Sequence, residues 1–198
     1  MSLVYGIGIN NQEIPSRING IQTKEYKLWC RMLVRCTEKY WDKRPTYIGT
    51  TCSENFKDYA YFHEWCHNQI GFDNKDESDK NWHLDKDLLV KGNKLYSEDT
   101  CVFVPQRINT LLIKSNASRG EYPIGVYWCK NGKKFRSKCN NGSGKQKPLG
   151  YFNTHQEAFQ AYKVFKEALI REVAEDYKSK VDSRLYQALL AYKVEITD

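Results

Sequence analysis

The sequence predicts an α+β protein with a helical first half and a second half built from a three-stranded antiparallel sheet packed on an α-helix. Apolar side chains recur at helical spacing in residues 24–41 and again in residues 53–68. Three strand patterns and one amphipathic helix then follow one another in residues 124–170. The chain has 198 residues, of which 40% are hydrophobic, enough to bury the core of one ordinary domain or of two small ones.

The two N-terminal helical patterns carry large side chains that we expect to form a core. In residues 24–41 the apolar face includes Trp29 and Leu33. In residues 53–68, Ser53 can cap the helix, and an aromatic stripe follows it: Phe56, Tyr59, Phe62 and Trp65. Because the burial of large rings dominates core energetics, both stripes are interpreted as core.

A strand–turn–strand–helix pattern comes next. Trp82–Leu89 is a strand candidate, turn-forming residues stand at Lys91-Gly92-Asn93, and a second strand is expected at Cys101–Val104. Pro105 suits the first position of a helix, and the residues after it continue at helical spacing.

A polar stretch separates this pattern from the rest of the chain. Lys114–Pro123 is rich in small and polar residues and contains a glycine and a proline, which is typical of a linker. The sequence therefore predicts two domains, residues 1–115 and residues 116–198.

The second predicted domain has the clearest local signals. Strands are expected at Ile124–Lys130, at Lys133–Asn140 and around Leu149–Phe152. Asn131-Gly132, between the first two, is the strongest short signal for a β-hairpin turn. Thr154 and Glu157 form a predicted capping box at the start of the helix that covers one face of the sheet.

Positive charge is concentrated in this domain. The chain has 31 Lys and Arg against 24 Asp and Glu, a net charge of +7, and residues 119–147 account for all of this excess. Lys134, Arg136 and Lys138 alternate along one face of a predicted strand, and Tyr127 stands on the neighbouring strand. Because focused positive charge attracts a polyanion, this face predicts nucleic-acid binding.

Other protein classes are disfavoured. No apolar run approaches the roughly 20 residues of a membrane span, and the mean hydropathy is -0.72. The first residues lack the basic and apolar regions of a secretory signal. Seven cysteines, an odd number, then suggest reduced thiols and a cytoplasmic location.

Three motifs of the second domain occur in the order of a known family. They are Gly125-Val126-Tyr127-Trp128, Lys134-Phe135-Arg136 and Leu149-Gly150-Tyr151-Phe152-Asn153-Thr154. Together they resemble the ethylene-response-factor (APETALA-type) DNA-binding domain over about residues 119–170, although that family usually has tryptophan at the position of Phe135.

This resemblance implies that the sheet enters the major groove of double-stranded DNA. By matching position, Arg136 and Tyr127 are the candidates for base contacts. Lys134 and Lys138 are candidates for phosphate contacts. Lys130, at the hairpin turn, is a further DNA-binding candidate.

The first domain carries further motifs: Trp29–Cys36, Pro45–Gly49 and above all Leu84–Asn109. They resemble phage-encoded HNH (His-Me finger) homing-type endonucleases that carry the same DNA-binding domain at the C-terminus. The resemblance implies a ββα-metal cradle around one divalent cation, Mg²⁺ or Mn²⁺, that hydrolyses a DNA phosphodiester. It also implies a bacterial or phage-infected cytoplasm.

The resemblance also assigns metal ligands. Asp85 and Asn109 match the two protein ligands of the family, and both offer the oxygen atoms that Mg²⁺ prefers. Asn93 matches a position where the family often has an asparagine that stabilises the turn or the cradle. Asp87 is either a second acid near the metal or a structural turn cap.

The general base is the point at which the sequence departs from the family. The family usually has a histidine directly after the metal-binding aspartate, and this chain has Lys86 there. A lysine is a poor base at neutral pH unless its pKa is lowered, although a protonated Lys86 could stabilise the phosphate or protonate the leaving group. His83, two residues before Asp85 and on the same strand face, is the other candidate base, or else an edge histidine beside Trp82.

Zinc is not expected. Four cysteines and a histidine could converge in principle: Cys30, Cys36, Cys52, Cys66 and His67. The chain has no C-x-x-C pair, however, and small thiols on helix faces are ordinary core residues. His63 and His67, on the aromatic helix, are likewise interpreted as structural.

The sequence therefore predicts a metal-dependent DNA endonuclease, whose N-terminal domain cuts or nicks while the C-terminal sheet selects the site. A catalytically inactive DNA-binding or regulatory protein, with a degenerate HNH scaffold, is the alternative. The residue that separates the two is Lys86, because a histidine at that position would favour the enzyme outright.

Overall fold

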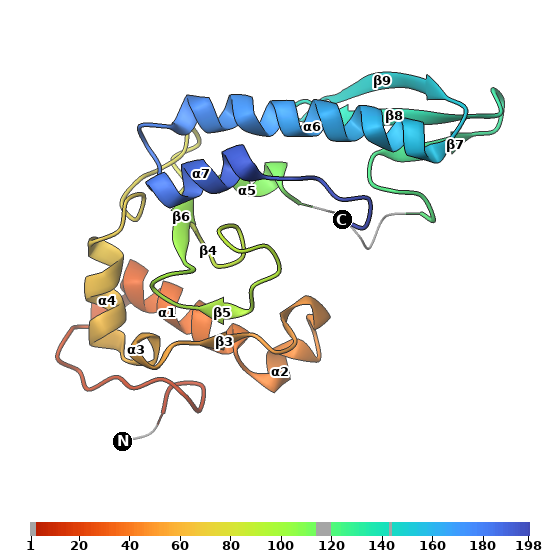
Figure 1. The fold of residues 1–198 in the computed structure, drawn as a ribbon. Coiled ribbons are helices and arrows are strands. Elements are labelled where there is room, and N and C mark those ends of the chain that lie inside the picture. The colour runs from red at the N-terminus through yellow and green to blue at the C-terminus, as the bar shows by residue number, and fades with distance from the viewer. Residues whose placement is uncertain (1–2, 114–119, 143) are drawn as a thin grey trace. The chain divides into compact units, whose positions relative to one another are not determined.

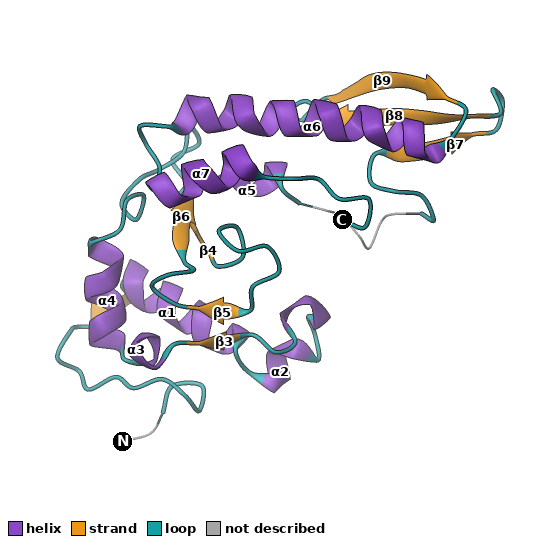
Figure 2. Ribbon diagram, in the orientation of Figure 1, coloured by secondary structure: helices purple, strands orange, loops and turns teal. Residues whose placement is uncertain are grey.

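The protein has a mixed α+β fold, described by a computed structural model for residues 3–113, 120–142 and 144–198 (Figures 1 and 2). The chain divides into two compact units. The first unit comprises Met1–Pro105 and Lys180–Leu185, and the second comprises Gln106–Ser179 and Tyr186–Asp198. The boundary thus falls at Pro105, ahead of the expected linker, whose residues 114–119 lie outside the described part of the chain. Within the described ranges, no helix is both long enough and apolar enough to cross a membrane.

The helical pattern of residues 24–41 forms two helices, α1 (Lys24–Arg35) and α2 (Glu38–Trp41). The Thr23 side chain caps α1 by accepting a hydrogen bond from the backbone N–H of Tyr26 at 3.2 Å. The helix stops before Thr37, whose backbone is extended (φ −109°, ψ 143°) and whose hydroxyl donates to the carbonyl of Val34 at 2.7 Å. A threonine side chain that bonds to the backbone in this way competes with helix continuation.

Residues 53–68 are also divided, into α3 (Glu54–Lys57) and α4 (Tyr59–His67). Ile9 causes the break, because its backbone donates to the carbonyl of Lys57 at 2.7 Å and accepts from the N–H of Tyr59 at 2.9 Å. Asp58, held extended between the two helices, then caps α4 by accepting from the N–H of Ala60 at 2.7 Å.

The aromatic stripes form the core of the first unit, as predicted. Phe56 contacts Phe62 and Trp65, with ring centroids 5.2 Å and 4.7 Å apart. The indole N–H of Trp29 donates to the buried carbonyl of Phe56 at 2.8 Å. Phe103 extends this core, since its ring centroid lies 5.9 Å from that of Trp65.

Short strands complete the first unit: β1 (Arg17–Ile18), β2 (Ile21–Gln22), β3 (Thr51–Cys52), β4 (His83–Asp85), β5 (Leu95–Tyr96) and β6 (Val102–Val104), with a 3-10 turn, η1, at Pro45–Tyr47. The strands β4 and β6 pair antiparallel, and β3 pairs with β5 in parallel. As predicted, a helix, α5 (Gln106–Leu111), follows Pro105 directly.

The second unit contains the predicted three-stranded antiparallel sheet, in the order β7 (Val126–Cys129), β8 (Lys134–Asn140) and β9 (Gln146–Phe152). The long helix α6 (His155–Tyr177) runs along it (Figure 1). The predicted capping box is present, with Glu157 N–H donating to the Thr154 hydroxyl at 3.2 Å and Thr154 N–H donating to the Glu157 carboxylate at 3.3 Å. The helix α7 (Ser183–Ala191) crosses the boundary between the units at Leu185.

The β7–β8 turn lies where Asn131-Gly132 predicts it but has a different backbone. The left-handed residue is Lys133, with φ 46°, and its N–H faces the Lys130 carbonyl at 3.4 Å. A left-handed residue at the end of a longer loop is typical of hairpins built on a type I turn rather than on the two-residue type I′ turn.

The inner face of the sheet packs closely on α6 at Gly125. The buried residues of this core are Val126, Cys139, Ala158, Phe159, Tyr162 and Val194. Gly125 has φ 78°, and a Cβ atom placed on it would lie only 2.0 Å from the ring of Tyr162. Only glycine allows both this backbone conformation and this approach.

We expect Gly125→Ala to lower the free energy of unfolding by about 3 kcal/mol, since it adds a steric clash to an unfavourable backbone conformation. Urea unfolding of the full chain, followed by circular dichroism, measures the change. Gly144→Ala is the matched control, because Gly144 has φ 83° and open space around it. The control should lose only about 1 kcal/mol, and equal losses in the two variants would contradict close packing at Gly125.

Candidate functional site

The outer face of the β7–β8–β9 sheet gathers cations and aromatic rings. Tyr127, Arg136 and Tyr151 lie side by side across the three strands in register. The two tyrosines are 48% and 57% exposed. Lys134 follows on the same side of β8 and is also exposed.

Two of the cations lie over tyrosine rings. The Lys138 ammonium is 4.4 Å from the centre of the Tyr127 ring, and the Arg136 guanidinium is 5.9 Å from that of Tyr151. Such contacts hold a cation over an aromatic face while leaving it open to an anion. The remaining DNA-binding candidate, Lys130, is exposed at the start of the hairpin turn.

The alternation along β8 produces this face. Phe135, Ser137 and Cys139 point inward and are buried or half-buried, whereas Lys134 and Arg136 are exposed. Phe135 packs against Trp128 with ring centroids 4.8 Å apart. The residues that the sequence assigns to an outward-facing cationic surface therefore occupy one.

In the first unit, Asp85 ends β4 and shapes the loop that follows. Its Oδ1 accepts hydrogen bonds from the N–H groups of Asp87 and Leu88, at 3.0 Å and 2.8 Å. These bonds turn the chain away from β6, so the predicted strand Trp82–Leu89 is limited to His83–Asp85. Burial, together with the neighbouring Asp87 carboxylate, raises the pKa of Asp85 to about 6.

Asn93 fastens the far side of this loop. Its side-chain amide donates to the carbonyls of Lys86 and Leu95 at 2.6 Å and 2.7 Å, and its Oδ1 accepts from the N–H of Leu95 at 3.2 Å. The asparagine therefore closes the turn between β4 and β5.

The two candidate bases occupy different surroundings. The Lys86 side chain is 8% exposed, and its ammonium donates to the carbonyl of Asn93 at 2.9 Å and faces the Asp87 carboxylate at 3.3 Å. His83 is half-buried on β4, opposite Val104 of β6. It shares a strand face with Asp85, because side chains two residues apart point the same way.

The two predicted metal ligands belong to different units. Asp85 lies at the end of β4 in the first unit, and Asn109 lies on α5 in the second. Within the first unit, the acidic side chain that interacts with the Asp85 carboxylate is that of Asp87. Carboxylate oxygens of this kind suit a hard cation such as Mg²⁺.

The structure also brings together three residues that were not predicted as a site: Glu25, His63 and His67. Among the described residues, these three form the group of His, Cys, Asp or Glu side chains whose ligand atoms lie close enough together to bind one metal ion. The cysteines considered for zinc do not belong to this group. The spacing of the two histidines, four residues apart on one helix, was the available signal. Glu25 could not be assigned to them from the sequence because it lies on another helix, α1.

The raised pKa of Asp85 leads to a pH-dependent stability. The folded state holds the proton of the Asp85 carboxyl group more tightly than the unfolded chain does. Its stability therefore falls as the pH rises through about 6. We therefore expect Asp85→Asn, which keeps an Oδ1 acceptor, to exceed the wild type by about 2 kcal/mol in free energy of unfolding at pH 7.5 and to match it at pH 4.

Urea unfolding at the two pH values tests this expectation. Asp79→Asn is a control, since Asp79 is an exposed carboxylate of the same unit, and it should change stability little at either pH. An Asp85→Asn variant that is less stable than the wild type at pH 7.5 would contradict the burial of the charge.

The chain matches no family model, no curated protein and no solved structure. The resemblance to phage endonucleases, carried by short motifs such as Leu84–Asn109, therefore stays an expectation from the sequence. What the outer face of the β7–β8–β9 sheet and the Asp85 loop bind is inferred from the position and chemistry of their side chains.

Proposed function

We propose that the protein binds double-stranded DNA through the outer face of its β7–β8–β9 sheet and hydrolyses the DNA backbone with a divalent metal ion at Asp85. The observation that carries the proposal is the row formed by Tyr127, Arg136 and Tyr151, with Lys134 and Lys138 beside it. The row combines the two kinds of side chain that duplex DNA recognition uses, cations for phosphates and planar donors for base edges.

The shape and chemistry of this face suit the major groove. The groove admits a β-ribbon, and Arg136 stands on the central strand, where it would meet the groove floor. A guanidinium can donate two parallel hydrogen bonds to a guanine. The flanking lysines would contact phosphates, which fix the orientation of the sheet without reading the sequence.

The hydrolytic part of the proposal rests on the Asp85 loop. Burial, and after it the nearby Asp87 carboxylate, raises the pKa of Asp85, and a bound cation would favour the ionised form of Asp85. When bound, Mg²⁺ or Mn²⁺ supplies a Lewis acid that stabilises charge on the scissile phosphate. Asp85 would hold the ion, while Asn93 keeps the loop closed around it.

His83 is the better candidate for the base of this reaction. Histidine is the side chain that most often serves as a general base, and His83 lies on the same face of β4 as Asp85. Lys86, by contrast, is buried, with its ammonium bonded to the carbonyl of Asn93. This bond favours a role for Lys86 in holding the loop.

The engaged Lys86 also supports a second candidate function. The endonuclease family that the sequence resembles usually has a histidine as general base at position 86. If no other residue of this chain acts as the base, the first unit is only a scaffold and the protein is a catalytically inactive DNA-binding protein. Binding and cleavage are therefore tested separately.

We expect Arg136→Ala to weaken binding to a duplex selected by the wild type from a random-sequence pool by about 10- to 100-fold, because a bidentate base contact is lost. Fluorescence anisotropy at several salt concentrations measures the affinity. Lys134→Ala should weaken binding to all duplexes alike and reduce the salt dependence, as a phosphate contact does.

The matched control is Arg171→Ala. Arg171 is an exposed arginine on α6, 3.6 Å from the Glu167 carboxylate. Equal affinities of the Arg136 and Arg171 variants would show that the sheet face does not contact DNA.

Cleavage is tested with the same duplex embedded in a plasmid, in Mg²⁺ or Mn²⁺. We expect the wild type to yield nicked or linear DNA and Asp85→Ala to abolish this product while leaving DNA affinity nearly unchanged. Asn109→Ala tests the second ligand that the family resemblance implies. Intact plasmid in both metals, with binding retained, would leave the DNA-binding function alone.

The same assay assigns the base. Loss of a general base lowers the rate by about 100-fold or more, so His83→Ala should do so if His83 is that base. Lys86→Met should instead lower the stability of the loop. The opposite result, slow cleavage by a stable Lys86→Met variant and full activity of His83→Ala, would assign the role to Lys86.

A further inference from the structure

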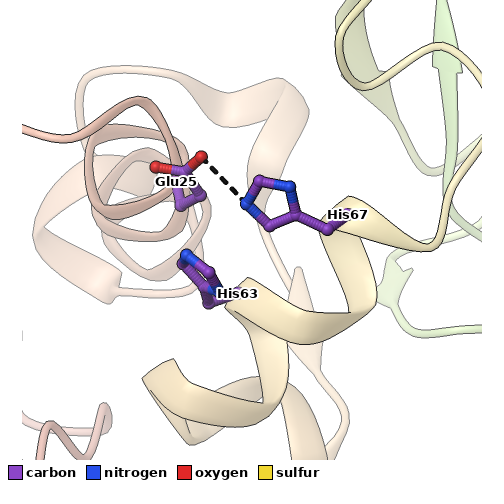
Figure 3. A group of neighbouring side chains, drawn as sticks. All are labelled: Glu25, His63 and His67. Carbon is purple, nitrogen blue, oxygen red and sulfur yellow. Dashed lines mark ion pairs between the residues drawn. The ribbon is translucent and has the colours of Figure 1, made fainter. Parts of the chain in front are cut away.

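A second group of potential metal ligands joins two helices of the first unit (Figure 3). His63 and His67 lie one helical turn apart on α4, so their rings project from the same face of the helix. Glu25, in the first turn of α1, points toward both of them (Figure 3). We propose that these three residues bind one Zn²⁺ ion, or a similar divalent transition metal that prefers imidazole.

The spacing of the ligand atoms suits such an ion. One ligand atom from each residue lies within 4.8 Å of the others, and the Glu25 carboxylate is 3.2 Å from Nε2 of His67. Around a tetrahedral zinc with bonds of about 2.0–2.1 Å, neighbouring ligand atoms are about 3.3 Å apart. The widest of the present separations, at most 4.8 Å, would have to shorten by about 1.5 Å to reach this value.

The set of ligands selects the class of metal. Two imidazoles and one carboxylate are a common protein ligand set for zinc, and they leave a fourth position for water or another ligand. Mg²⁺ prefers oxygen ligands and would gain little from two imidazole nitrogens. The site would thus take a different metal from the one proposed at Asp85.

The surroundings hold the ligands in place. The Tyr59 hydroxyl is 3.1 Å from the hydroxyl of Thr23, the cap of α1, which links the starts of the two helices. The His67 ring packs on Phe72 with centroids 4.9 Å apart. Lys24, the nearest cation along α1, is turned away to the Phe72 carbonyl and the Asp73 carboxylate. Glu25 therefore keeps its charge directed toward the histidines.

An ion pair alone does not account for this arrangement. Glu25 and His67 are sufficient for such a pair, yet His63 brings a second imidazole to the same place, with ring centroids 4.6 Å apart. A shared metal ion would use all three side chains as ligands. The side chain of His67 is 44% exposed and that of Glu25 13%, so an ion can enter from solvent.

The experiment uses the full chain, stripped with a chelator and titrated with Zn²⁺ and separately with Co²⁺. We expect one ion per chain and a thermal unfolding midpoint that rises with Zn²⁺. The Co²⁺ spectrum should show visible bands of a tetrahedral or five-coordinate site without a thiolate charge-transfer band, since all three ligands are nitrogen or oxygen. Mg²⁺ at the same concentration should not shift the midpoint in this way.

Variants test the individual ligands. His67→Ala is the main variant, because His67 is exposed and its loss should leave the apo fold intact, as judged by circular dichroism. The affinity for Zn²⁺ should fall by about 100-fold or more in His67→Ala, His63→Ala and Glu25→Gln. The matched control is His155→Ala, a histidine of the second unit, which should bind Zn²⁺ like the wild type.

Two results would overturn the proposal. One is a wild-type chain that binds no Zn²⁺ at stoichiometric concentrations, which would leave Glu25 and His67 as an ion pair. The other is a metal bound elsewhere, which undiminished affinity in His67→Ala would show; a thiolate band with Co²⁺ would then place it at cysteines. Neither result bears on DNA binding or Mg²⁺-dependent cleavage, so this proposal and the proposed function can fail independently.

Discussion

The close approach of the Tyr162 ring to the backbone of Gly125 is the contact on which the second unit depends. It brings α6 against the start of β7 and so fixes which face of the sheet is covered. Because side chains alternate along a strand, covering one face determines what the other displays. A slip of one residue in β8 would bury Arg136 and expose Phe135, which would remove both the core and the cationic surface.

The sequence predicts this unit well because its signals are local. The alternation along β8 and the capping box of Thr154 and Glu157 each involve residues that are neighbours in the chain or across a short turn. Patterns of this kind depend on intrinsic backbone and side-chain preferences, which can be recognised in the sequence without knowledge of the rest of the fold. The outer cations are found for the same reason, since their position follows from strand periodicity.

The first unit is harder to predict because distant segments decide it. The break between α3 and α4 depends on hydrogen bonds from Ile9, which no helical periodicity reveals. Glu25 meets His63 only because α1 and α4 pack together. Each of these features requires tertiary structure, whereas the aromatic core is predictable from composition and spacing.

The path of the chain between the units has a consequence for how the protein can be divided. The first unit is completed by Lys180–Leu185, where Val181 and Leu185 are buried and Arg184 donates to the carbonyls of Glu98 and Asp99 at 3.2 Å and 3.3 Å. The two units are therefore interleaved along the chain instead of following one another. A fragment that ends near residue 115 lacks the buried residues that Lys180–Leu185 contributes to the first unit. A single recombination crossover could therefore not exchange either unit as a whole.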